Sequence, residues 1–323
     1  MINLETCPAH IKGEEDNENF VAYMDTDSVY IAAEPLLRYL YPNFDEMGEE
    51  EKDNKLEDIA LKYQGLITDY YSEMSTDVFN VPVHHFNMKT ECIIRSAYFR
   101  ATRRYAQWIT KKEGVIKNEL DIKGLEFMKA NFPPIFGKFF NKILKSALTG
   151  AQQGEIDKWL LDFRKYIMSK ECDIAILGNP TRVNTLGEKV KDKKTGQLVD
   201  KYIESPPKPG EMFSLIKPKA PAPVKAAIKY NDLLSFWGLD KQYSRIVQGD
   251  TIKWIYLRDN PYRIEALAFL DFDMPEKIRI LLDEYADKPK SFESILESKL
   301  EGFYHDLGWS LNLNPYRNMF FSF

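Results

Sequence analysis

The chain of 323 residues has little of the chemistry that holds small or zinc-stabilised proteins together. Its 3 cysteines, Cys7, Cys92 and Cys172, lie far apart, and its 4 histidines lack the spacing of zinc ligands. A disulfide framework and a structural zinc are therefore not expected, and a reducing cytoplasm is favoured. Any metal must be held by oxygen ligands, which points to magnesium-type chemistry.

The sequence also lacks an apolar run near the roughly 18 residues that a membrane helix needs. Residues 1–5 have neither the basic stretch nor the apolar core of a secretory signal. With 44% hydrophobic and 29% charged residues, the chain is too apolar for a disordered protein. We expect a cytoplasmic protein of about two domains, on a prior of roughly 150 residues each, with no membrane partner.

Charge is unevenly distributed, although the net charge is only -5. Residues 1–75 carry 18 acidic and 5 basic side chains, a net of -13. Residues 100–150 carry 11 basic and 4 acidic ones, a net of +7, and residues 181–230 carry 11 basic and 5 acidic ones, a net of +6. Two basic segments suit a protein that binds nucleic acid locally, although solvated charged faces would give the same counts.

Hydrophobic periodicity predicts a mixed first part of the chain. Residues 20–33 read as a tight hairpin with its polar turn at residues 25–28. Residues 55–79 follow helical spacing and predict an amphipathic helix that could cover a sheet, with the acidic residues 43–53 as its solvated lead-in. Residues 83–109 read as strands that continue the hairpin's sheet, and Gly114 predicts the next turn.

The pattern becomes more helical after Pro133 and Pro134. Helices are predicted over residues 135–148, 155–170 and 224–237, and a strand over residues 251–257. Residues 179–223 are rich in Lys, Gly and Pro and predict loop or ribbon. The sequence therefore predicts an α+β chain in which a mixed domain precedes a helical one.

Two carboxylates, Asp25 and Asp27, fall at the expected hairpin turn. Strand alternation places Tyr23, Asp25 and Asp27 on one face, where both carboxylates could reach a divalent ion. For the Asp-x-Asp tripeptide alone, an Asx-rich hairpin turn is the favoured interpretation. The full string Tyr23-Met24-Asp25-Thr26-Asp27-Ser28 resembles motif C of family B DNA polymerases, usually Tyr-Gly-Asp-Thr-Asp-Ser, with Met24 in place of the common glycine.

Two further strings follow in the order of that family. Residues 101–106, Ala-Thr-Arg-Arg-Tyr-Ala, resemble its basic Lys-Lys-Arg-Tyr element, which holds the primer terminus. Residues 121–126, Asp-Ile-Lys-Gly-Leu-Glu, resemble the strand that leads from palm to thumb. The resemblance implies a DNA-binding role for Thr102, Arg103, Arg104, Tyr105, Lys123 and Gly124, with Tyr105 at the primer end. Alternatively, Arg103 and Arg104 are an exposed edge-strand charge pair and Gly124 an ordinary turn.

Residues 223–231 and 252–261 are similar to late segments of T-even bacteriophage polymerases of the same family. The family's motif A, its fingers string Lys-x-x-x-Asn-Ser-x-Tyr-Gly and its exonuclease carboxylates are not found in the sequence. The resemblance thus implies the C-terminal portion of a polymerase. Residues 1–120 would be a palm remnant, an antiparallel sheet with a covering helix, and residues 121–323 a largely helical thumb.

The resemblance implies a two-metal Mg²⁺ site with Asp27 as shared ligand and Asp25 as its helper. An N-terminal polymerase chain would supply the other carboxylate and the cations that bind the dNTP, so this chain alone should not polymerise on primer-template DNA. A split gene, an intron-interrupted gene or a truncated frame would each give this sequence. A phage protein of this kind acts in the host cytoplasm.

Two alternatives remain open at this stage. One is a non-catalytic subunit that binds DNA and tethers a sliding clamp, and the other is a metal nuclease, for which Asp25 and Asp27 lack a nearby third acidic ligand. The aromatic C-terminus also has two interpretations. Its side chains either pack on the thumb or insert into a sliding-clamp pocket, as T-even polymerase tails do; they are Met319, Phe320, Phe321 and Phe323.

Overall fold

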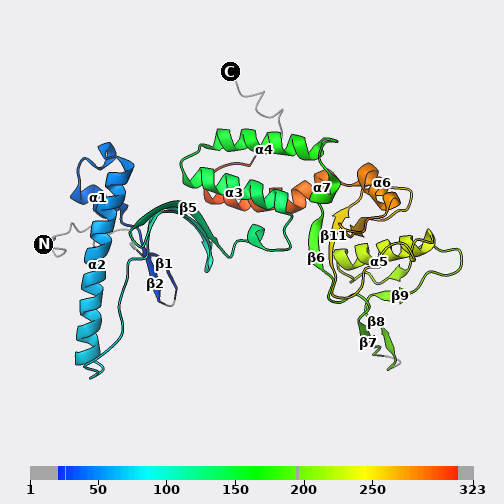
Figure 1. Ribbon diagram of the computed structural model, residues 1–323, viewed down its shortest axis with the longest axis horizontal. Helices are drawn as coiled ribbons and strands as arrows, with labels where there is room; N and C mark the ends of the chain where they lie inside the picture. Colours follow the sequence, from blue (N-terminus) through cyan, green and yellow to red (C-terminus); the bar gives the residue numbers. More distant parts are fainter. Residues whose placement is uncertain (1–20, 26, 194–195, 312–323) are drawn as a thin grey trace, which may run out of the picture. The chain divides into compact units, whose positions relative to one another are not determined.

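The computed structural model describes residues 21–25, 27–193 and 196–311. It is an α+β structure, as predicted, and its described strands pair in small antiparallel sheets (Figure 1). The chain forms two compact units, residues 1–125 with 148–150, and residues 126–147 with 151–323. None of the described helices has the length and apolarity needed to cross a membrane.

The first unit begins with the predicted hairpin. Strand β1 (Val21–Asp25) pairs with β2 (Ser28–Ile31), and Asp25 lies opposite Ser28 at the turn. Strands β3 (Cys92–Ala101), β4 (Arg104–Lys112) and β5 (Val115–Lys123) form a second sheet. The prediction of one continuous sheet is wrong for the described residues, because the hairpin contacts the second sheet through side chains.

A long helix, α2 (Glu49–Asp77), follows a short one, α1 (Glu34–Leu40), and a 3-10 turn, η3 (Phe44–Glu46). The helix begins within the stretch predicted as a solvated lead-in, and this prediction is wrong. Glu49, Glu50 and Glu51 occupy its first turn, where carboxylates favour a helix start by interacting with the helix dipole.

Polar side chains attach α2 to the sheet. Lys111 on β4 bonds Glu57 at 2.6 Å, and Arg95 on β3 bonds Asp53 at 2.8 Å. These contacts involve the first half of the helix. The turn from β4 to β5 has Glu113 and Gly114 at φ 50° and 77°, as in the primed turns that suit β-hairpins, which agrees with the turn predicted at Gly114.

The second unit is itself α+β. Phe136 and Phe140 on α3 and Phe163 on α4 contribute rings to its helical core. A three-stranded sheet, in the order β12-β11-β6, packs against α5. Between β6 and α5 the described residues form two short ribbons, β7 with β8 and β9 with β10, as their composition predicts. The elements are η4 (Glu126–Met128), α3 (Pro134–Leu148), α4 (Gln153–Met168), η5 (Ile174–Ile176), β6 (Asn179–Arg182), β7 (Lys189–Lys191), β8 (Leu198–Asp200), β9 (Ile203–Ser205), β10 (Leu215–Ile216), α5 (Ala222–Phe236), β11 (Thr251–Tyr256), β12 (Ala266–Phe269), α6 (Glu276–Tyr285), α7 (Lys288–Phe292), the π-helix η6 (Glu293–Glu297) and α8 (Ser298–Asp306).

Candidate nucleic-acid and metal-binding site

The β3–β4 turn carries the predicted basic element. Ala101 and Arg104 are the last paired residues, so Thr102 and Arg103 form the two-residue turn. Arg103 has a φ of 60°, a left-handed conformation that non-glycine residues rarely adopt. Its backbone N–H donates to the hydroxyl of Tyr23 at 3.0 Å, and this bond helps to hold the turn against the β1–β2 hairpin.

Arg103 also binds Asp25 on the β1–β2 hairpin, which we call the carboxylate hairpin because it carries Asp25 and Asp27. Its Nε lies 2.8 Å from Oδ2 of Asp25 and its Nη2 3.1 Å from Oδ1, so the guanidinium contacts both oxygens. The Arg103 side chain is 71% exposed and that of Asp25 30%. The hydrogen bond to Asp25 raises the pKa of Arg103, which therefore keeps its charge. Two strings that are far apart in the sequence thus meet at one ion pair.

Gly124 completes this corner of the sheet. Tyr105 pairs with Lys123 across β4 and β5, which brings Gly124 beside the β3–β4 turn. Gly124 has a φ of 63°, and a Cβ at this position would overlap the carbonyl oxygen of Arg103. The glycine is required here by both conformation and close approach. This is a structural role in the turn, and the DNA-binding role of Gly124 stays a prediction.

Four aromatic rings join the hairpin to the sheet. Tyr23 pairs with Tyr30 across β1 and β2, and Phe99 pairs with Tyr105 across β3 and β4. The Tyr23 ring stacks on Phe99 at 5.2 Å between centroids, and the hydroxyls of Tyr30 and Tyr105 lie 3.2 Å apart. Burial, and then the bond to Tyr105, raise the pKa of Tyr30. The sequence pattern does not predict this cluster, although its members are aromatic residues within predicted strands.

The structure brings the six predicted DNA-binding residues together at one end of β3, β4 and β5. Thr102, Arg104 and Lys123 are exposed, and Tyr105 is half-buried within the aromatic cluster. Arg104 makes no ion pair with any described residue, while Lys123 lies 3.6 Å from Asp121. We call Arg103, Arg104 and Lys123 the cationic corner. Asp25 pairs with Arg103 and Asp121 with Lys123, so Arg104 is the one of these three cations that no described carboxylate pairs with.

The predicted metal ligands are only partly arranged as expected. Asp25 ends β1, but Asp27 lies in the turn, so strand alternation does not place them on one face. Asp27 is exposed and makes no bond within the described part of the chain, whereas both oxygens of Asp25 contact Arg103. Within the described residues, no group of three or more His, Cys, Asp or Glu side chains could hold a metal ion. Asp25 and Asp27 could supply at most part of the oxygen ligands that an Mg²⁺ ion needs.

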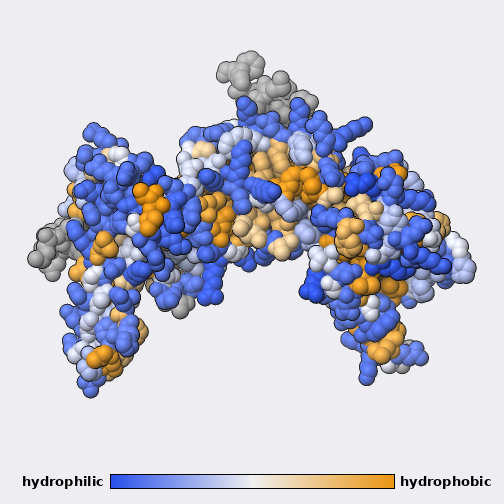
Figure 2. Space-filling view, in the orientation of Figure 1, coloured by the Kyte–Doolittle hydropathy of each residue, from blue (hydrophilic) through white to orange (hydrophobic). Residues whose placement is uncertain are grey.

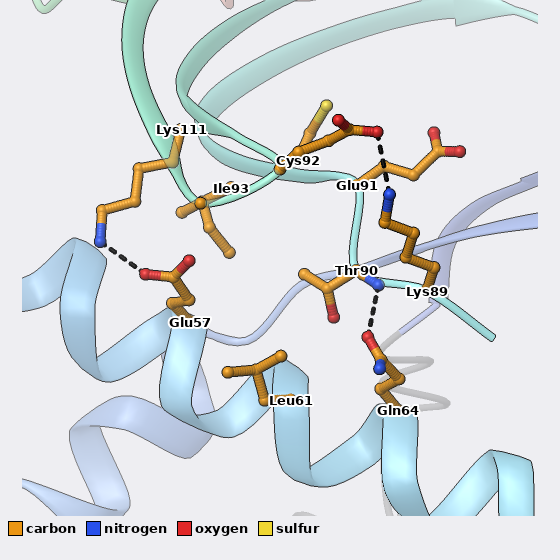
Figure 3. Close-up of a pocket in the computed structure, with 11 residues that line it drawn as sticks. Glu57, Leu61, Gln64, Lys89, Thr90, Glu91, Cys92, Ile93 and Lys111 are labelled. Atoms are coloured by element: carbon orange, nitrogen blue, oxygen red, sulfur yellow. Dashed lines mark hydrogen bonds and ion pairs between the residues drawn. The ribbon is translucent and has the colours of Figure 1, made fainter.

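A pocket of ≈ 430 Å³ lies between α2 and the β3–β4 sheet (Figure 3). Two ion pairs line it, Lys111 with Glu57 and Lys89 with Glu113 at 3.0 Å, and the carboxylate of Glu91 lines it without an ion pair to any described residue. Burial raises the pKa of the Cys92 thiol, so this cysteine is a poor nucleophile.

The predicted clamp-binding residues, Met319, Phe320, Phe321 and Phe323, lie outside the described residues. No protein-family model and no curated protein matches the chain. The candidate site therefore depends on its sequence strings and on the geometry of residues 21–125.

Proposed function

We propose that this chain is the C-terminal portion of a family B DNA polymerase of the T-even bacteriophage type. In this proposal residues 1–120 are a palm remnant, residues 121–323 are a thumb, and the protein acts in the host cytoplasm. The observation that carries the proposal is the hydrogen bond from the backbone N–H of Arg103 to the hydroxyl of Tyr23. It joins the motif C-like hairpin to the string that resembles the primer-holding element.

The cationic corner supports a role in binding primer-template DNA. Arg103, Arg104 and Lys123 are exposed at the ends of adjacent strands, as suits neutralisation of successive phosphates. Such contacts position a duplex without reading its sequence. In this proposal Tyr105, held by the aromatic cluster, would position the primer end.

The carboxylates have distinct tasks in this proposal. When bound, Mg²⁺ would activate the primer hydroxyl and neutralise charge on the dNTP phosphates. Asp27 offers an exposed carboxylate for the ion, and Arg103 orients Asp25 beside it. An N-terminal polymerase chain supplies the remaining carboxylate, the dNTP-binding cations and the exonuclease.

A second candidate is a non-catalytic subunit that binds DNA and tethers a sliding clamp. The engagement of both Asp25 oxygens by Arg103 favours it, because a carboxylate held in this way is not free for a metal. In that case the cationic corner would bind the duplex and the residues around Met319 would bind the clamp, without any contribution to nucleotide addition.

Primer extension separates the two candidates. The full chain, the N-terminal polymerase chain and their mixture would each be incubated with primer-template, dNTPs and Mg²⁺. The proposal expects no extension by this chain alone and new or strongly increased extension by the mixture. If the N-terminal chain extends primers equally well without its partner, and this chain changes only product length with clamp present, the non-catalytic candidate is correct.

A further inference from the structure

The second half of α2 carries an apolar stripe that no described residue covers. Over the first half, Leu36 and Leu37 of α1 pack on Ile59. Figure 1 shows α1 only beside this first half. Helical spacing places Leu66 and Tyr70 further along the face of Ile59, and these two side chains are 53% and 61% exposed. The helix thus continues its apolar face beyond the element that buries it.

The segment after α2 adds exposed apolar side chains to the same end of the helix. It folds back along α2, since Ser75 donates to the Val81 carbonyl at 2.6 Å and the rings of Tyr71 and Phe86 lie 6.1 Å apart. Figure 2 shows apolar surface at this end of α2. We define the distal α2 surface as Leu66, Tyr70, Val78, Phe79, Val83 and Phe86, all exposed.

The acidic charge around the distal α2 surface indicates which kind of binding partner is complementary to it. Residues 63–88 contain no Lys or Arg and three acidic side chains, Asp69, Glu73 and Asp77. All three are exposed, and none forms an ion pair with the described residues. Acidic charge repels nucleic acid phosphates, and it also disfavours docking of this surface on a second copy of itself. A protein with basic side chains around apolar anchors is complementary to it.

We infer that the distal α2 surface docks a segment of the N-terminal polymerase chain, with apolar side chains on Leu66 and Tyr70 and Lys or Arg beside Asp69 and Glu73. The inference rests on the proposed function, because that chain is the partner the proposal requires. An exposed apolar patch of this kind marks an interaction site in a soluble protein. The partner would extend the cover that α1 gives to the first half of the helix.

Calorimetric titration of the full chain with the purified N-terminal polymerase chain tests this interface. Leu66→Glu with Tyr70→Glu should weaken binding by about tenfold or more, because buried apolar anchors dominate such interfaces. Leu61→Glu is the matched control, since Leu61 lies on another face of the same helix and is 52% exposed. It should change affinity by less than about twofold. Asp69→Lys with Glu73→Lys should also weaken binding by several-fold.

Circular dichroism would confirm that each variant stays folded, as expected from the good helix propensity of Glu and Lys. Binding that weakens with the Leu66 and Tyr70 changes but not with Leu61→Glu supports the interface. Equal affinities for all variants, or equal weakening by Leu61→Glu, would reject the interface and leave the proposed function intact. Failure of the wild-type chain to bind would reject both. A dimer of this chain that Tyr70→Glu dissociates would assign the surface to a second copy.

Discussion

Gly124 lies against the carbonyl oxygen of Arg103, so closely that no side chain fits between them. The contact ties the end of β5 to the β3–β4 turn and hence to Asp25, which Arg103 binds. The conformation of one glycine therefore affects both the cationic corner and the carboxylate hairpin.

Replacement of this glycine should damage the corner. We expect Gly124→Ala to lower the free energy of unfolding by about 1–3 kcal/mol, because it adds a Cβ at positive φ in a closed space. It should also weaken primer-template binding. Gly65→Ala is the control: Gly65 lies within α2 with nothing within 4 Å of an added Cβ, so this change should be neutral or stabilising by up to about 1 kcal/mol. Urea unfolding of both variants checks the prediction, and similar effects would contradict it.

The basic turn should contribute to the salt dependence of DNA binding. Arg103→Ala with Arg104→Ala should flatten the slope of log K against log salt by up to about two phosphate contacts, each worth roughly 0.9. Sequence preference should not change. Fluorescence anisotropy from low to moderate salt measures the slope, with the exposed Lys62→Ala on acidic α2 as control. An unaltered slope would mean that both arginines face solvent in the complex.

Tyr30 should make the first unit sensitive to alkali. Its pKa is raised above the usual 10.0, because burial favours the neutral phenol. The unfolded chain therefore loses this proton first as pH rises. The stabilisation that neutral Tyr30 gives the folded state is fully present below pH 10.0 and decreases above it, because ionisation of Tyr30 in the unfolded chain shifts the folding equilibrium toward the unfolded state.

Melting curves at pH 8 to about 11 would show this loss, and Tyr30→Phe should reduce the pH dependence at a small cost in stability. Tyr39→Phe, at an exposed ring, is the matched control. If Tyr30→Phe and wild type lose stability in parallel, Tyr30 is not the group responsible.

The two interpretations of the C-terminal aromatic residues, clamp binding and packing on the thumb, predict different results for their deletion. Deletion of residues 319–323 should leave thermal stability and distributive synthesis nearly intact but sharply shorten products made with a sliding clamp, because tethering acts through effective concentration. If these aromatic side chains were buried, their deletion would instead lower the free energy of unfolding by several kcal/mol. A large drop in melting temperature without a clamp-specific defect would show that they belong to the thumb core.

Much of the fold could be predicted from the sequence because its periodic patterns are local. The hairpin around Asp25, the turn at Gly114 and helix α5 follow from alternation, turn residues and helical spacing. The start of α2 at Glu49 was missed because a run of acidic residues serves equally as a loop or as a favourable first helical turn. The separation of the two sheets depends on packing and not on local pattern.

The sequence could indicate which residues to consider for the candidate site, but not how these residues contact one another. The strings around Asp25 and Arg104 could be read from the sequence, and the structure brings these two strings into contact, while the functions of their residues stay predictions. The ion pair of Asp25 with Arg103 and the aromatic cluster with Tyr30 depend on contacts between distant segments, which spacing along the chain does not encode.

The most direct test is nucleotide addition by Asp27→Asn in the enzyme assembled from this chain and the N-terminal polymerase chain. An amide cannot replace a charged ligand shared by two cations, so primer extension should be abolished while duplex affinity stays within about a few-fold. Asp25→Asn should have a weaker effect, and Asp58→Asn, at an exposed position on α2, should have none. Extension that persists at the wild-type rate in Asp27→Asn would contradict the catalytic assignment.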